Sequence, residues 1–242
     1  FKTDEEARNY KVDQSFVNQM INASALDNGL HAGDLKFVDL DGNNKIEQTT
    51  SANDRKDMKV IGNSLPRYNY NFGISADWYG IDFSVLFQGI GKQNWYPGAE
   101  TSMFWGPYSR PYASFIPSDF MSQVWSEENT DAYFPRPRGY VALGSNRELA
   151  VVNTKYLQNL AYCRLKNLSI GYTLPDKWLS KIGFEKIRVY FSGENLLTFT
   201  KLHSDYIDPE QASASNSWKT SKSDANIYPW AKTYSFGVDI TF

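Results

Sequence analysis

The stretch that decides the fold is Lys232-Thr-Tyr-Ser-Phe-Gly-Val-Asp-Ile-Thr-Phe242. Its apolar side chains alternate with polar or small ones without exception. One face would carry Tyr234, Phe236, Val238, Ile240 and Phe242. Alternation with period two predicts a β-strand with one apolar and one polar face. Its length also suits a strand that crosses a bilayer, which takes about 9–11 residues.

The same alternation predicts four further strands, at about 68–78, 80–91, 160–174 and 186–199, before the last one at 232–242. A minimal turn at Trp78-Tyr79-Gly80 separates the first two, which indicates a hairpin. In the strand at 160–174, Cys163 and Leu165 fall out of phase with the residues that follow. We expect a β-bulge near Lys166 to cause that switch.

The connections alternate between long and short. Residues 1–67, 93–159 and 200–231 are long, whereas the turns at 78–80 and 175–185 are short. This asymmetry is typical of an outer-membrane β-barrel with long extracellular loops, and it would place the C-terminus on the periplasmic side. We therefore expect two regions. Residues 1–67 would be an extracellular loop region with a short helix from Thr3 to about Tyr10 and an Asp/Asn-rich turn, and 68–242 would carry the barrel strands.

A soluble β-sandwich also has alternating strands, so it is the main alternative. Aromatic residues at the strand ends, such as Tyr68, Trp78 and Tyr234, count against it because they resemble an interfacial girdle. Loops as long as 93–159 are also uncommon in compact domains. Five strands are too few to close a membrane barrel, which needs at least about 8, so we expect other strands to complete the cylinder.

Composition narrows the function classes. Aromatic residues make up 16% of the chain although its mean hydropathy is −0.51, as expected when one face is apolar and the other polar. The 25 basic and 27 acidic residues give no basic excess, which argues against nucleic-acid binding. A lone Cys163 forms no internal disulfide. No nucleophile elbow, phosphate loop or zinc motif is present, so the sequence does not predict an enzyme.

An ordered set of phrases resembles the C-terminal end of SusC/RagA-type TonB-dependent outer-membrane transporters. These phrases lie at 33–46, 54–55, 60–63, 68–73, 83–89, 164–175, 188–190, 192–199, 208–210, 228–229 and 233–242. The resemblance implies a 22-stranded barrel with an N-terminal plug, of which this chain would supply five strands. It also implies TonB-driven import of oligosaccharides, or peptides in some members, beneath a SusD-like surface lipoprotein. Phe242 resembles the terminal aromatic signal of barrel assembly.

One segment resembles a calcium-binding loop. Asp39, Asp41 and Asn43 stand at alternate positions, followed by Lys45 and then Glu47. This is the EF-hand spacing of oxygen ligands. It departs from that pattern because Asn44 replaces the turn glycine and Thr50 stands where a bidentate acid belongs. Asp54 could supply that acid only if Thr49–Asn53 is an insertion that loops out. The segment predicts a Ca²⁺ or Mg²⁺ site, and a metal-free Asx-rich turn is the alternative.

The loop at 93–159 is rich in aromatic residues. Trp95, Trp105 and Tyr112 are our candidates for contact with an oligosaccharide or with the lid lipoprotein, because interfaces favour Trp and Tyr. Packing inside the loop is the alternative. The polar strand residues Asp82, Gln88, Glu194 and Asp239 are expected to line the lumen or to touch the plug, or else simply to fill the barrel.

We therefore expect the distal sector of an oligosaccharide importer embedded in the outer membrane, which would work with a SusD-like lipoprotein and with TonB. A soluble glycan-binding sandwich and a passive porin are the alternatives.

Overall fold

The computed structural model describes residues 1–14, 30–51, 53–109, 116–137, 142–143, 148–180, 183–215, 222–223 and 228–242. The chain forms two compact units. The loop unit comprises Phe1–Gly62, Tyr96–Leu157 and Lys222–Asn226. The sheet unit comprises Asn63–Trp95, Gln158–Ser221 and Ile227–Phe242. None of the helices in the described ranges is both long and apolar enough to cross a membrane.

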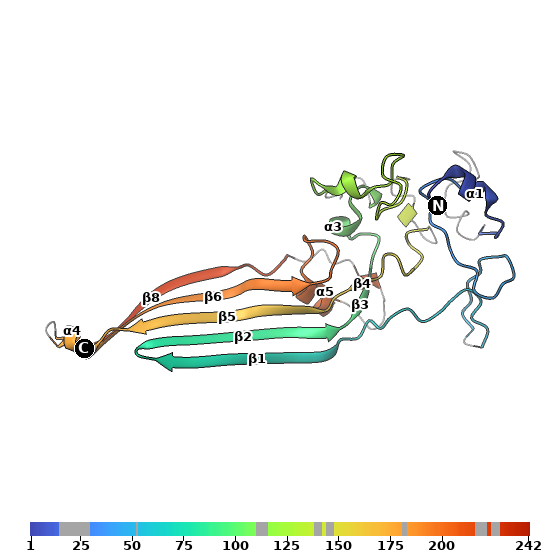
Figure 1. Cartoon of the computed structure of the whole chain (residues 1–242). Helices are drawn as coiled ribbons and strands as arrows, with labels where there is room; N and C mark the ends of the chain where they lie inside the picture. Colours follow the sequence, from blue (N-terminus) through green and yellow to red (C-terminus); the bar gives the residue numbers. More distant parts are fainter. Residues whose placement is uncertain are drawn as a thin grey trace. The chain divides into compact units, whose positions relative to one another are not determined.

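The sheet unit is built on five long antiparallel strands that run side by side in the order β1-β2-β5-β6-β8 (Figure 1). They are β1 (Arg67–Trp78), β2 (Ile81–Lys92), β5 (Tyr162–Thr173), β6 (Lys186–Thr200) and β8 (Thr233–Thr241). Their boundaries differ from those predicted from the alternation by no more than two residues. Each strand pairs with its neighbour along the chain, which is the meander of an up-and-down barrel wall.

The turns at one end of the sheet are short for local reasons. Tyr79 (φ 48°) and Gly80 (φ 85°) both adopt positive φ, which is the backbone of the tight two-residue hairpin turn between β1 and β2. In the connection from β5 to β6, the described residues form one short helix, the four-residue α4 (Asp176–Leu179). Figure 1 shows α4 and the C-terminus at this same end of the strands.

The predicted bulge is confirmed. Leu165 and Asn167 of β5 pair with Phe87 and Leu86, which are adjacent residues of β2, so Lys166 is the extra residue. On the other side of β5, the register with β6 shifts at the same place. The bulge restores the alternation, because Arg164 and Asn167 both face the polar side although three positions separate them.

The loop unit joins the two long connections that sequence analysis treats as separate loops. It contains α1 (Asp4–Asn9), α3 (Ser102–Trp105) and the 3₁₀ turns η1 (Gly106–Tyr108) and η3 (Phe120–Gln123). The Thr3 hydroxyl caps α1 by accepting a hydrogen bond from the Glu6 amide. The backbone amide of Arg136 donates to the Gly33 carbonyl (2.9 Å), which ties the second connection to the first.

Three short strands form a second sheet among the described residues, in the order β4-β3-β7. β3 (Asn94–Pro97) begins in the sheet unit, where it pairs antiparallel with β4 (Gln158–Asn159). Its last two residues belong to the loop unit and pair in parallel with β7 (Lys222–Ser223). One further helix, α5 (Pro209–Ser215), follows β6 in the sheet unit.

Candidate functional site

One face of the five-stranded sheet is apolar and uncovered. The register aligns Ala76, Phe83, Ile170, Phe191 and Phe236 in a single row across all five strands. Rings on this face contact one another, with 5.2 Å between the centroids of Phe191 and Phe236. Yet Phe236 is 82% exposed and Ile74 is 61% exposed. An apolar surface that spans five strands marks a contact with a partner or with lipid.

Exposed aromatic residues gather at both ends of the strands. The short-turn end carries Trp78, Tyr79, Trp178 and Phe242, and the other end carries Tyr68, Phe199, Tyr228, Trp230 and Tyr234. Aromatic residues in two bands that flank an apolar band are typical of a transmembrane barrel, where their rings lie at the headgroup level. Phe242, the predicted assembly signal, is exposed and lies 6.3 Å from the Phe184 ring.

The opposite face carries mainly polar side chains. The next row of the register consists of five serines, Ser75, Ser84, Ser169, Ser192 and Ser235. The small hydroxyl groups of this row can both donate and accept hydrogen bonds. A row of serines next to a row of apolar residues is the period-two alternation expressed in three dimensions.

Close to this serine row, an ion-pair cluster crosses the polar face. Arg188 of β6 reaches over β5 and donates two hydrogen bonds to Asp82 of β2, at 2.7 and 2.6 Å. Its third nitrogen donates to Asp239 of β8 at 3.2 Å. Gly171 of β5 makes this reach feasible, because a Cβ there would lie 2.4 Å from an Asp82 oxygen. Two of the predicted inward residues, Asp82 and Asp239, therefore meet around an arginine that sequence analysis did not single out.

The tryptophans predicted to contact a ligand lie in the interior. Trp95, in the sheet unit, is 1% exposed, and Trp105, in the loop unit, is 0% exposed. The Trp105 indole donates to the Gly98 carbonyl at 2.9 Å, and its ring packs against Phe104, Phe134 and Tyr156. Packing inside the loop, the alternative given above, describes Trp105, whereas Trp95 is buried in the sheet unit. The third candidate, Tyr112, lies outside the described residues.

Buried tyrosines complete the core of the loop unit. Tyr108 and Tyr156 donate to the carbonyls of Pro135 and Tyr133, and Tyr96 donates to the Leu149 carbonyl at 2.8 Å. Burial raises the pKa of all three hydroxyls, so they stay protonated donors at every physiological pH. These three tyrosines therefore belong to a packed core of the loop unit.

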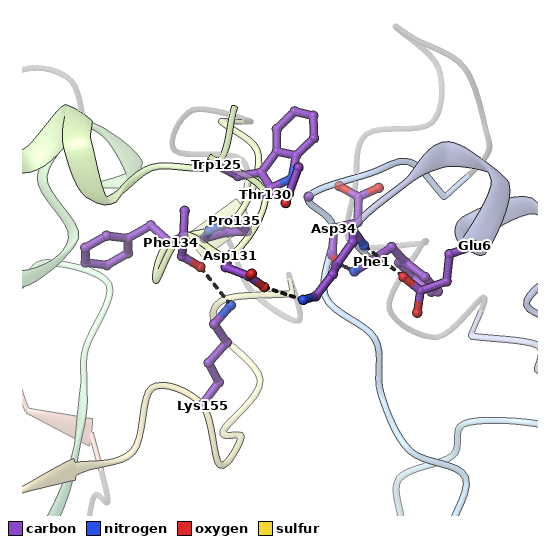
Figure 2. Close-up of a pocket in the computed structure, with 12 residues that line it drawn as sticks. Phe1, Glu6, Asp34, Trp125, Thr130, Asp131, Phe134, Pro135 and Lys155 are labelled. Atoms are coloured by element: carbon purple, nitrogen blue, oxygen red, sulfur yellow. Dashed lines mark hydrogen bonds and ion pairs between the residues drawn. The ribbon is translucent and has the colours of Figure 1, made fainter. Parts of the chain in front are cut away.

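Hollows open between described residues of the loop unit. The first holds about 290 Å³, and residues of both long connections line it, among them Asp34, Trp125, Asp131 and Lys155 (Figure 2). Lys2 and Asp131 form an ion pair of 2.6 Å there. The second holds about 700 Å³ and is lined by parts of 34–40, 57–61 and 150–155. Its volume falls within the range of about 300–1,000 Å³ that is usual for ligand pockets.

The segment predicted to bind calcium, called here the acidic loop (residues 39–57), brings together a different set of carboxylates from the predicted one. Oxygens of Asp39, Asp41 and Asp57 lie within 4.8 Å of one another. Asp57 is the member that sequence analysis missed, because Asp54 was expected to supply the acid that the EF-hand spacing lacks at Thr50. Asp54 instead pairs with Lys56 at 3.4 Å.

The remaining predicted ligands interact mainly with one another. The Asn43 amide donates to Asp41 and Glu47, and Lys45 forms a 3.1 Å ion pair with Glu47. Desolvation is the largest single influence on Asp39 and raises its pKa, but hydrogen bonds from the backbone N–H groups of Asn44 and Gly42 together with its other donors outweigh desolvation and lower the pKa. The Lys45 ammonium lowers the pKa of Glu47. Both of these carboxylates are therefore ionised at neutral pH, and cation binding in this loop stays a prediction.

Comparison with known proteins decides the family. The chain is 31% identical over 212 residues to the TonB-dependent receptor P3 of Formosa agariphila, an alignment that covers 85% of this chain and 19% of that protein. It is 26% identical over 227 residues to the TonB-dependent receptor P26 of the same organism, covering 92% of this chain and 21% of that receptor.

The fold agrees with this result. A solved structure of the RagAB peptide transporter superposes with a TM-score of 0.54 and 22% identity, covering 80% of this chain and 19% of that one. The RagAB peptide importer in its closed-closed state gives a TM-score of 0.52 and 23% identity, with the same coverage. The chain belongs to the SusC/RagA type of TonB-dependent receptors. No protein-family model matches it.

The chain spans about a fifth of the length of the TonB-dependent receptors that it matches. Its five-stranded sheet is thus a sector of an antiparallel β-barrel. Membership of the family was predictable from the ordered phrases. The joining of the two connections into one loop unit was not, because the contacts between them connect residues far apart in the chain.

Proposed function

We propose that this chain forms part of the wall and outer loops of a TonB-dependent importer in the outer membrane. The uncovered apolar face carries the proposal. Its row of five apolar side chains, which includes Phe83, Phe191 and Phe236, is far more stable in a lipid environment than in water. The receptors to which the chain is similar are named TonB-dependent. The two alternatives are weaker. A soluble sandwich would need a second layer over this face. A passive porin would leave the similarity to TonB-dependent receptors unexplained.

The cargo that we propose is an oligosaccharide, and the polar face supports it. Five aligned serine hydroxyls offer donors and acceptors that match sugar hydroxyl groups. A peptide is the second candidate, because the similar solved structures are those of a peptide importer. The buried Trp95 and Trp105 favour neither cargo. The partners that we propose are TonB and a SusD-like lipoprotein. The two-component name RagAB of the similar structures supports the lipoprotein partner.

Cell fractionation with directed labelling tests the proposal. Cysteines are placed at the neighbouring positions Phe236 and Ser235 of β8 in the intact receptor, with Cys163 replaced by alanine. We expect the receptor in the outer-membrane fraction, with a water-soluble maleimide labelling the Ser235→Cys variant and sparing the Phe236→Cys variant. Equal labelling at both positions of a soluble protein would refute the proposal. Uptake of matched oligosaccharides and peptides by cells with and without the receptor then distinguishes the two cargoes.

A further inference from the structure

The chain that follows β6 turns back onto the sheet. Within the sheet unit, Leu202, Ile207 and Ala212 are 7%, 5% and 0% exposed, so this connection has its own buried apolar anchors. Figure 1 shows α5 beside the ends of β5 and β6. A connection that simply extended into water would expose all three of these side chains, so the segment 201–212 is a packed element.

Asp208 holds three segments together with a single carboxylate. Its Oδ1 accepts hydrogen bonds from the Glu210 and Gln211 amides, which caps the start of α5. Its Oδ2 accepts from Arg164 of β5 at 2.7 Å and from the backbone amide of Trp230 at 3.2 Å. Asp208 therefore joins the sheet, helix α5 and the residues that return toward β8.

Arg164 is the matching group on the sheet. Its side chain is only 3% exposed, and it donates to Asp208 (2.7 Å), Glu210 (2.8 Å) and the Thr198 hydroxyl (2.9 Å). Lys166, the bulge residue, adds a second contact with Glu210 at 3.2 Å. Two cations thus meet two carboxylates, and the cluster is neutral. Buried charges that are paired and fully hydrogen-bonded make a rigid contact, because opening it would strand an unpaired charge.

The return of the connection toward β8 is fastened as well. Asn195 of β6 has a positive φ of 54°, which asparagine tolerates, and its amide donates to the Ala231 carbonyl at 3.3 Å. The Lys166 ammonium lies 5.3 Å from the centre of the Trp230 ring. Both ends of the connection between β6 and β8 are therefore tied to the sheet.

The register shows which face the connection covers. Arg164 pairs with Gln88 of β2 and with Thr198 of β6. Gln88 lies on the same side of β2 as Asp82 and Ser84, which is the polar face. Arg164 thus points from the polar face, and the segment that it holds lies over that face.

We propose that 201–212 is an inward-folded loop, fixed in the lumen by the Arg164–Asp208–Glu210 latch, so that solute passes beside it. This inference rests on the proposed function, because only in a barrel is the polar face the lumen. Arg164 and Asp208 are positioning residues that act on the loop and not on the solute. All the contacts of the latch are made by residues of this chain, so the latch holds the loop in place in the receptor without bound solute.

Thiol labelling in the intact receptor tests the latch. In a Cys163→Ala background, we expect the buried Ala212→Cys thiol to react with a small maleimide at least about tenfold more slowly than an exposed Glu127→Cys thiol. Adding Arg164→Gln should raise the Ala212→Cys rate by at least about tenfold, since Asp208 and Glu210 lose their main partner and the loop opens more often. A second change, Asp208→Asn, keeps the helix cap acceptor and should recover part of the protection.

Arg188→Gln is the matched control, because it removes the other ion-pair cluster of the polar face without touching this connection. We expect it to leave the Ala212→Cys rate unchanged. An unchanged rate in Arg164→Gln, with the receptor still in the outer membrane, would overturn the latch. Should Arg164→Gln fail to assemble, the Ala212→Cys labelling rate is measured in Asp208→Asn alone and compared with the rate in Arg188→Gln. The latch predicts a faster rate in Asp208→Asn, and equal rates would overturn it. Absence of the wild-type receptor from the outer membrane would instead overturn the proposed function.

A second probe tests the position in the lumen. Asp205 is exposed within the loop, so an Asp205→Cys thiol should react readily with a small maleimide. A polymer-linked maleimide added to whole cells should react with it much more slowly than with the Glu127→Cys thiol, because the barrel wall surrounds the loop. Equal rates with the bulky reagent would show that the loop projects outward and would overturn the proposal.

Discussion

At the scale of single residues, Gly171 is a position where the polar face is packed tightly. The side chain of Arg188 crosses β5 at this glycine, and an added Cβ would overlap both Arg188 and Asp82. We expect Gly171→Val to break the two hydrogen bonds between these residues and to destabilise the barrel by about 1–3 kcal/mol. The thermal unfolding midpoint of the receptor in detergent measures this.

Ser169→Val is the control for that substitution. Ser169 lies on the same strand and the same face, two positions away, and it belongs to the serine row. Because it supports no ion pair, its replacement should lower the midpoint much less. Similar losses in both variants would mean that the tight packing around Gly171 has no special weight.

The alternation of single residues was predictable, whereas the contacts of single residues were not. The faces of Phe236, Ser235 and their neighbours follow from period two alone. The contact between Arg188 and Asp82 depends on the registers of two strand pairs and on a glycine between them. A sequence pattern does not predict a contact that runs from β6 across β5 to β2. Sequence analysis therefore missed Arg188, although it singled out Asp82 and Asp239.

At the scale of elements, the joining of the two long connections depends on Gly33. Its φ is 86°, and a Cβ there would lie 2.5 Å from the Trp125 ring. We expect Gly33→Ala to loosen the contact between the first connection and the segment around Trp125, which hydrogen exchange of the backbone amides near Trp125 and Arg136 would detect.

Gly42→Ala is the control that separates steric overlap of the added Cβ from the strain of a positive φ. Gly42 also has a positive φ (77°), but a Cβ there meets nothing within 4 Å. Its replacement costs only the backbone strain of the left-handed region. Equal exchange near Trp125 in both variants would contradict the role of Gly33 in joining the connections.

The acidic loop should weaken in acid. Its carboxylates Asp39 and Glu47 have pKa values below their ordinary ones in the folded loop. Their contribution to stability is therefore complete above the unfolded pKa values of about 4 and is lost as pH falls through the lower folded values. Amide exchange of 39–47 should rise as the pH is lowered below about 4, after correction for the intrinsic rate. A pH-independent protection would contradict this account.

Asp57 should matter more to this loop than Asp54. Its two oxygens accept the Leu40 and Glu47 amides, each at 2.7 Å, so Asp57→Ala leaves two N–H groups without these acceptors. Asp54→Ala removes only an exposed ion pair with Lys56. We expect faster amide exchange in 39–47 for the first variant only. If the predicted Ca²⁺ site exists, calcium will slow that exchange in the wild type and not in Asp57→Ala.

The elements themselves were mostly predictable, and their association was not. Strong alternation defined the five strands, and the change of phase at Leu165 located the bulge. The EF-hand spacing, in contrast, placed Thr50 at the position of the bidentate acid, so Asp54 was chosen as an acid that an inserted loop could bring there. The fold instead brings in Asp57 after the chain has turned, and it buries Trp95 and Trp105 in cores that no local pattern defines.

At the scale of the whole molecule, adjacent residues of β8 should respond in opposite ways to charge. Phe236→Lys places an ammonium on the apolar face, where a charge near the bilayer centre costs about 2–4 kcal/mol. Ser235→Lys places it on the polar face, where water or a polar partner is available. We expect the first variant to reach the outer membrane in much smaller amounts, and the second to approach wild type. Quantitative fractionation with a heat-modifiability gel gives both amounts, and equal loss in the two variants would contradict a lipid-facing Phe236.

The central claim is that the apolar face of this sheet contacts lipid. Spin labels placed singly from Thr233 to Thr241 in the intact receptor test it most directly, with oxygen as the collision partner from lipid and a nickel chelate as the one from water. Oxygen accessibility should peak at Tyr234, Phe236, Val238 and Ile240, with nickel low at the same positions. Labels at these four positions that are shielded from both reagents would show a buried face and would contradict the account.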